Sequence, residues 1–77
     1  MTKQELLNGD EFTFNNELWC EENLSDDFRS ASVSFNTRTQ MFVVWFNGVV
    51  VHCSKTFKSL ENKVNTLSNE WNLKSED

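Results

Sequence analysis

The segment that decides the fold is Met41-Phe42-Val43-Val44-Trp45-Phe46-Asn47-Gly48-Val49-Val50-Val51-His52-Cys53. Two β-branched and aromatic runs flank Asn-Gly, the pair that best tolerates the positive φ angles of a type I′ turn. The pattern therefore predicts a β-hairpin with a two-residue loop, in which Phe46 faces Val49. Continuing that register pairs Trp45 with Val50, Val44 with Val51, Val43 with His52 and Phe42 with Cys53. One face then carries Phe42, Val44, Phe46, Val49, Val51 and Cys53, and the opposite face carries Met41, Val43, Trp45, Val50 and His52.

A second strand is predicted upstream, because residues 31–37 alternate strictly between apolar and polar side chains. A short loop around Arg38 and Thr39 connects it to the hairpin. That loop places Phe35 opposite Phe42, Val33 opposite Val44 and Ala31 opposite Phe46, all on the same apolar face. Residues 12–20 continue the alternation, with a bend or turn at Asn15-Asn16, through Phe12, Phe14, Leu18 and Cys20.

Downstream, apolar residues recur at helical spacing in Phe57, Leu60, Val64, Leu67 and Trp71. They predict an amphipathic helix with Ser54 or Thr56 as its N-cap. Residues 2–7 predict a short helix that Gly9 ends, and residues 74–77 are expected to fray. The expected fold is one α+β domain over residues 1–77. It is a three- to four-stranded antiparallel meander in the order α-β-β-β-α, with the C-terminal helix packed on one face.

Length and composition set the limits on this fold. The chain has 77 residues, of which 38% are hydrophobic, and it includes three Trp and seven Phe. One core is all that such a chain can build, and its large aromatic residues make disorder unfavourable. Because no segment reaches the roughly 18 apolar residues of a membrane span, and no signal peptide is recognisable, we expect a cytoplasmic protein. If a phage encodes it, the compartment is the host cytoplasm.

The sequence carries no recognisable catalytic or metal-binding motif. Cys20, Cys53 and the single histidine, His52, cannot supply a tetrahedral zinc site at a known spacing, and we expect two buried free thiols. His52 has no carboxylate or nucleophile nearby in the predicted strand register. The acid pairs at 21/22 and 26/27 lack the ligand spacing of a calcium loop. The expectation is a non-enzyme without cofactor or metal.

Charge is unevenly distributed along the chain, whose net charge is −5. Residues 1–30 contain eight acids and two bases, whereas residues 31–60 contain three bases and no acid. Between Asp10 and Asp27 there are seven carboxylates and no base. Such like charges repel one another, so stability does not explain their grouping. They either keep an acidic domain soluble or form a binding surface.

The binding alternative is DNA mimicry, in which spaced carboxylates imitate phosphates and occupy the basic groove of a nucleic-acid-binding protein. With its acid-only stretch and compact αβ design, the chain resembles the small acidic proteins that phages make to disable host DNA-binding proteins, among them inhibitors of the nucleoid protein HU. The resemblance implies a basic DNA-binding host protein as partner, with no direct binding of nucleic acid. The candidate acidic surface consists of Asp10, Glu11, Glu17, Glu21, Glu22, Asp26, Asp27, Glu61 and Glu70.

The element order also resembles that of the double-stranded RNA-binding domain. That family has a lysine-rich start to its last helix, which clamps phosphates. Here Lys55, Lys58 and Lys63 are interspersed with Glu61 and form no such run. The chain therefore shares the order of elements with that family but lacks its phosphate clamp.

The face opposite the predicted core offers a second candidate surface. Met41, Val43, Trp45 and Val50 would lie there beside Ser32, Ser34 and Asn36, and an apolar patch around a tryptophan requires a cover or a partner. Leu6 and Leu7 of the N-terminal helix, or the segment around Leu24 and Phe28, are candidates for the cover. Otherwise the patch is an interface, either in a homodimer or in a non-mimic interaction or assembly module.

Overall fold

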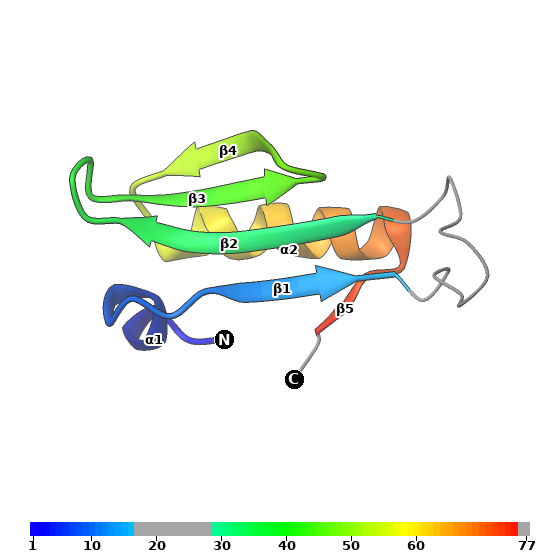
Figure 1. The fold of residues 1–77 in the computed structure, drawn as a ribbon, viewed down its shortest axis with the longest axis horizontal. Helices are drawn as coiled ribbons and strands as arrows, with labels where there is room; N and C mark the ends of the chain where they lie inside the picture. The colour runs from blue at the N-terminus through cyan, green and yellow to red at the C-terminus, as the bar shows by residue number, and fades with distance from the viewer. Residues whose placement is uncertain (17–28, 76–77) are drawn as a thin grey trace.

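The computed structural model describes residues 1–16 and 29–75. The five strands of this part form one antiparallel sheet in the order β4-β3-β2-β1-β5 (Figure 1). The sequence correctly predicted an α+β meander with a C-terminal helix packed on one face. The elements are α1 (Lys3–Leu7), β1 (Phe12–Asn15), β2 (Ser30–Asn36), β3 (Met41–Phe46), β4 (Val49–Ser54), α2 (Phe57–Trp71) and β5 (Lys74–Ser75).

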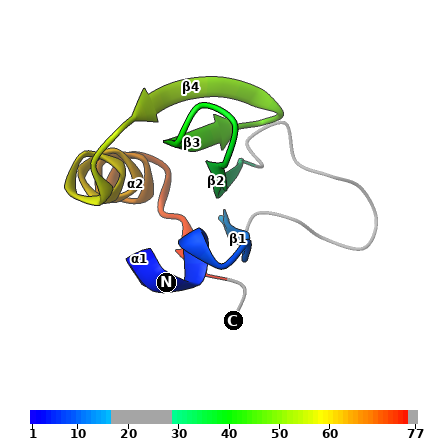
Figure 2. The ribbon, with the colours of Figure 1, turned by 90° about the vertical axis from the view of Figure 1, so that its left-hand side faces the viewer.

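Both helices lie on the same side of the sheet, which we call the inner face (Figure 2). The 3.6-residue periodicity of α2 directs Leu60, Val64 and Leu67 toward the strands, where all three are buried. Leu6 of α1 joins the same core and is fully buried. The core cluster consists of Leu6, Ala31, Val33, Phe42, Val44, Leu60, Val64, Leu67 and Leu73, with six partly buried aromatic side chains packed against it.

The register of β2 against β3 is the one predicted from the sequence. Phe35 pairs with Phe42, Val33 with Val44, and Ala31 with Phe46. The rings of Phe35 and Phe42 lie 4.9 Å apart between centroids, in a tilted arrangement. The connecting turn is closed by Asn36, whose Oδ1 accepts hydrogen bonds from the backbone N–H groups of Arg38 and Thr39.

The hairpin of β3 and β4 follows the predicted register only near its turn. Asn47 and Gly48 have φ angles of 52° and 84°, as a type I′ turn requires. Phe46 pairs with Val49 and Trp45 with Val50, but Val44 then pairs with His52 because a β-bulge adds Val51 to β4. The predicted pairs Val44–Val51, Val43–His52 and Phe42–Cys53 are therefore wrong, and the observed pairs are Val44–His52, Val43–Cys53 and Phe42–Ser54.

The bulge exchanges the faces of the residues that follow it. His52 was expected on the face opposite the core, yet it lies toward α2, with its Nε2 3.0 Å from Ser59 Oγ. Cys53 was expected in the core with a buried thiol, but it is exposed. Val51 was also expected in the core and is exposed. Cys20, the second predicted buried thiol, lies outside the described residues.

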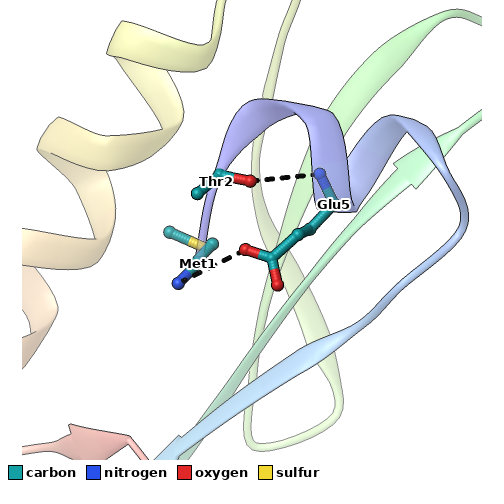
Figure 3. A network of polar contacts seen from close by, with 3 residues as sticks. All are labelled: Met1, Thr2 and Glu5. Atoms are coloured by element: carbon teal, nitrogen blue, oxygen red, sulfur yellow. Dashed lines mark hydrogen bonds and ion pairs between the residues drawn. The ribbon is translucent and has the colours of Figure 1, made fainter.

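Both ends of α1 are capped, and of these caps the sequence predicted the C-terminal stop at Gly9. Thr2 Oγ1 accepts a hydrogen bond from the Glu5 backbone N–H, and the N-terminal ammonium of Met1 lies 4.0 Å from Glu5 Oε1 (Figure 3). At the other end, Gly9 adopts a φ of 102°. Its N–H donates to Leu6 O, and the N–H of Asp10 donates to Glu5 O. These two bonds form a Schellman motif, so Gly9 ends the helix as predicted.

Of the two predicted N-cap candidates for α2, the cap is Thr56. Its Oγ1 accepts a hydrogen bond from the Ser59 N–H at 3.3 Å. Ser54 has a different role, because it is buried and its Oγ both accepts from the Thr56 N–H and donates to Thr56 O. The bulge makes this possible, since it turns Ser54 toward the inner face opposite Phe42.

The C-terminal end of α2 leads into a strand that the sequence did not predict. Asn72 has a φ of 55°, and the N–H of Leu73 donates to Ser68 O, which ends the helix. Leu73 is buried in the core. Lys74 and Ser75 belong to the segment expected to fray, but here they form β5 and pair with Asn15 and Phe14.

The strand β1 covers only the first part of the predicted segment 12–20. Phe12 and Phe14 pack against the core as predicted, whereas Leu18 and Cys20 lie outside the described residues. Asn16 and Arg29 join the adjacent ends of β1 and β2. The N–H of Asn16 donates to Arg29 O, and the N–H of Arg29 donates to Asn16 Oδ1. The predicted bend at Asn15-Asn16 thus coincides with the end of β1.

The core packing predicts that two substitutions lower the free energy of unfolding by very different amounts. Leu60→Ala removes a fully buried side chain between α2 and the sheet, and we expect it to lower the free energy of unfolding by about 2 to 5 kcal/mol. Val49→Ala changes a side chain that is 63% exposed and should cost about 0.5 kcal/mol or less. Urea denaturation followed by circular dichroism measures both. Equal losses would contradict this assignment of the core.

The bulge predicts that the Cys53 thiol is accessible in the folded protein. Iodoacetamide should label Cys53 in the native state to the same extent as in urea, since labelling requires exposure. Peptide mapping by mass spectrometry reports Cys53 separately from Cys20. Protection of Cys53 until the protein unfolds would instead support the continuous register without the bulge.

Candidate protein-binding surface

The sheet face turned away from α1 and α2, which we call the outer face, is covered by neither helix of the described residues (Figure 2). In β1 and β2 the apolar side chains point inward and the polar ones outward, whereas β3 is apolar throughout and places Met41, Val43 and Trp45 on the outer face. A row of serines from β2 runs along its centre, beside Trp45 of β3, which pairs with Ser32. Its strand residues are Thr13, Asn15, Ser30, Ser32, Ser34, Asn36, Met41, Val43, Trp45, Val50 and Cys53.

The four residues predicted for a dimer or partner face lie on this surface, but they are not equally accessible. Met41 is half-buried and Val43 is only 8% exposed. Trp45 is 40% exposed, and Val50, its cross-strand partner, is 43% exposed. The pair Trp45 and Val50 therefore forms the accessible apolar part of the outer face.

The predicted cover by the N-terminal helix is wrong. Leu6 packs in the core on the inner face, and Leu7 is exposed to solvent. The helix α1 therefore lies on the side away from Trp45 (Figure 2). Leu24 and Phe28, the other proposed cover, lie outside the described residues.

An open groove of about 410 Å³ follows the serine row of β2. Trp45 lines it beside Ser32, and Glu11 lies toward the Ser34 end, because Phe12 pairs with Val33 and Glu11 precedes it by one residue. The carboxylate of Glu11 is exposed and makes no ion pair within the described residues. The described residues of its wall are Glu11, Ser30, Ser32, Val33, Ser34, Trp45 and Gly48.

The predicted acidic surface is only partly described. Asp10 and Glu11 are exposed and precede β1. Glu61 and Glu70 belong to α2, on the other side of the sheet from the groove at Glu11. The structure thus does not bring these four carboxylates together on one face. Glu17, Glu21, Glu22, Asp26 and Asp27 lie outside the described residues.

The charge of α2 also differs from that of the acid-only stretch. Glu61 and Glu70 share this helix with Lys58 and Lys63, so its formal charges balance. The structure shows an ion pair between Met1 and Glu5. It shows none between Asp10 or Glu11 and another described residue, whereas the helix presents both signs of charge.

Sequence reasoning missed the contribution of Arg29, the base that follows the acid-only stretch. Its guanidinium carbon lies 4.6 Å from the ring centroid of Trp71, a cation–π geometry. Trp71 in turn lies 5.9 Å from Phe46 between centroids. No local spacing connects Arg29 with Trp71. Glu11, in contrast, shares the parity of Thr13, so the alternation around Phe12 could have placed it on the outer face.

The described residues offer little for catalysis or metal binding. Within residues 1–16 and 29–75, no carboxylate is hydrogen-bonded to His52, whose recorded partner is Ser59. The same residues contain no group of three or more His, Cys, Asp or Glu side chains that could hold a metal ion. None of the described helices has the length and apolar character needed to cross a membrane.

The geometry defines a small α+β domain in which neither described helix covers one face of the sheet (Figure 2). Comparison with protein families, with curated proteins and with solved structures found no match. Functional inference for this chain therefore rests on its own residues.

Proposed function

We propose that this chain is a non-catalytic binding protein that recognises another protein through the outer face of its sheet. The observation that carries the proposal is the exposure of Trp45 and Val50 on a face that neither described helix covers. Tryptophan is enriched among the residues that dominate protein–protein binding energy, because it buries a large area with few rotatable bonds. The polar serines around it match the polar rim that surrounds such anchors.

A second candidate is an acidic DNA mimic that binds and inhibits a basic nucleic-acid-binding protein, such as a nucleoid-associated protein, in competition with DNA. The observation in its favour is the stretch of seven carboxylates without a base between Asp10 and Asp27, of which Asp10 and Glu11 are exposed and unpaired in the described part. This candidate retains the resemblance to phage inhibitors of HU and places the protein in the host cytoplasm.

Substitution of Trp45 separates the two candidates. Trp45→Glu removes the apolar anchor and adds a negative charge. Binding through the outer face should fall by at least about tenfold, as expected for a central anchor residue, whereas an electrostatic mimic should bind a basic partner equally well or more tightly. The measurement is capture of partners from a nuclease-treated bacterial lysate, followed by titration of the captured protein.

Val49→Glu is the matched control, because it adds the same charge at an exposed position on β4. It should leave binding within about twofold of the original, in line with the small effects of most peripheral contacts. Sedimentation of the unmodified chain tests whether a second copy is the occupant of the face. Unchanged capture by the Trp45→Glu protein would reject the outer face as the binding surface.

The mimic makes its own prediction, which depends on Glu21, Glu22, Asp26 and Asp27. Changing these four to Gln or Asn should weaken binding to a DNA-binding protein and abolish competition with DNA. Binding of the unmodified chain should also decline steeply with salt, because exposed charges are screened beyond about 8 Å at physiological ionic strength. Fluorescence competition with labelled duplex DNA measures both effects. Undiminished competition by the fourfold variant would exclude the mimic.

A further inference from the structure

We propose that the groove between Glu11 and Trp45 binds an arginine side chain presented by a basic protein. The inference rests on the proposed protein-binding function of the outer face and specifies the chemistry of the partner. It differs from DNA mimicry because it depends on one carboxylate and one aromatic ring in a defined place. The acid-only stretch as a whole is not required.

The strand register brings the necessary groups to opposite sides of one groove. Trp45 lies on β3, Ser32 faces it on β2, and Glu11 lies beyond β2 at the start of β1. Two strand spacings, together about 9.5 Å, separate β3 from β1, and the offset from Ser32 to Ser34 adds about 7 Å along the strands, so the Cα atoms of Trp45 and Glu11 lie about 12 Å apart. Because both side chains line the groove, a guanidinium that enters it over Ser32 and Ser34 can stack on the Trp45 ring and direct its N–H groups toward the Glu11 carboxylate.

Each wall of the groove matches a different part of a guanidinium group. The face of a tryptophan ring attracts cations through its quadrupole and also accepts the flat guanidinium by stacking. The carboxylate of Glu11 supplies the opposite charge and up to two acceptor oxygens. Hydroxyl oxygens of Ser32 and Ser34 can accept from the remaining N–H groups, of which arginine has five.

Charge complementarity favours a cation over other occupants. The described wall of the groove contains one carboxylate and no basic side chain. The whole chain carries a net charge of −5, and the carboxylate of Asp10 is adjacent to Glu11. An anionic ligand such as a nucleic-acid phosphate would meet repulsion from both acids, whereas a basic protein would be attracted at long range.

The same molecule already contains an example of the proposed contact. The guanidinium of Arg29 lies over the ring of Trp71 at 4.6 Å. Trp71 thus contacts the chain's own arginine, whereas Trp45 is 40% exposed and lines the same groove as Glu11. The proposed contact repeats this geometry with an arginine from outside the chain.

The test uses a tetra-arginine peptide as probe, with a tetra-citrulline peptide as its neutral isostere. Titration at low salt is followed by two-dimensional NMR of the three tryptophan indole N–H signals, of which the Trp45 signal is assigned by its loss in Trp45→Phe. The arginine peptide should shift the Trp45 indole and the amides of Ser32 and Ser34, and the citrulline peptide should not. Shifts spread evenly over acidic residues, without the Trp45 indole, would overturn the proposal.

Two matched pairs of variants test the groove itself. Glu11→Gln and Glu70→Gln remove the same charge, but Glu70 is exposed on α2, away from the groove. Glu11→Gln should weaken peptide binding about two- to fivefold and Glu70→Gln by less than about 1.5-fold, the range expected of one partly exposed ion pair. Trp45→Leu should weaken peptide binding about two- to fivefold. Trp45→Phe should weaken peptide binding less, because the phenylalanine ring still attracts a cation.

Failure of this inference is distinguishable from failure of the proposed function. If Trp45→Glu abolishes capture of a protein partner but the arginine peptide leaves the Trp45 indole unshifted, the outer face is a binding surface without an arginine site. Equal weakening by Glu11→Gln and Glu70→Gln would show that only net charge attracts the peptide. Either result rejects the arginine groove, and chemical shift patterns of the variants verify that each remains folded.

Discussion

The packing of α2 on one face of the sheet is the contact on which the rest of this structure depends. Leu60, Val64 and Leu67 bury the inner face, and both described helices lie on that side. The other side of the sheet is covered by neither described helix (Figure 2). Serines along β2 suit contact with water there, while the exposed side chains of Trp45 and Val50 do not.

The sequence predicted an element correctly where two independent patterns indicated the same register. The register of β2 and β3 was predicted because strict alternation and a tight turn both specify it, and a slip by one residue would expose one apolar set. Beyond Val50, the pattern is ambiguous, since three consecutive valines suit either face. The bulged register brings His52 to Ser59 of α2 and allows Ser54 to bond the backbone of Thr56, and neither contact is visible in the alternation of the strand.

The candidate site was predicted in part for the same reason. Parity alone placed Trp45 and Val50 on the outer face, because both precede the bulge. Glu61 and Glu70 were grouped with the N-terminal acids by charge, and charge carries no information about which side of the sheet a helix covers. The groove at Glu11 requires the pairing of β1 with β2, which depends on a connection of more than a dozen residues that local patterns cannot specify.

Glu11 belongs to both candidate surfaces, which makes the two functional proposals less independent than the sequence suggested. It immediately precedes β1 at one end of the outer face, and the remaining acids of the stretch follow β1 in the sequence. A basic partner that meets Glu11 is also attracted by the net negative charge of the chain. Long-range attraction of that kind governs mainly the rate of encounter, whereas a buried aromatic anchor governs dissociation. In such a complex, salt would alter association while Trp45 determined its lifetime, so the acids and the tryptophan would contribute to one interaction at different steps.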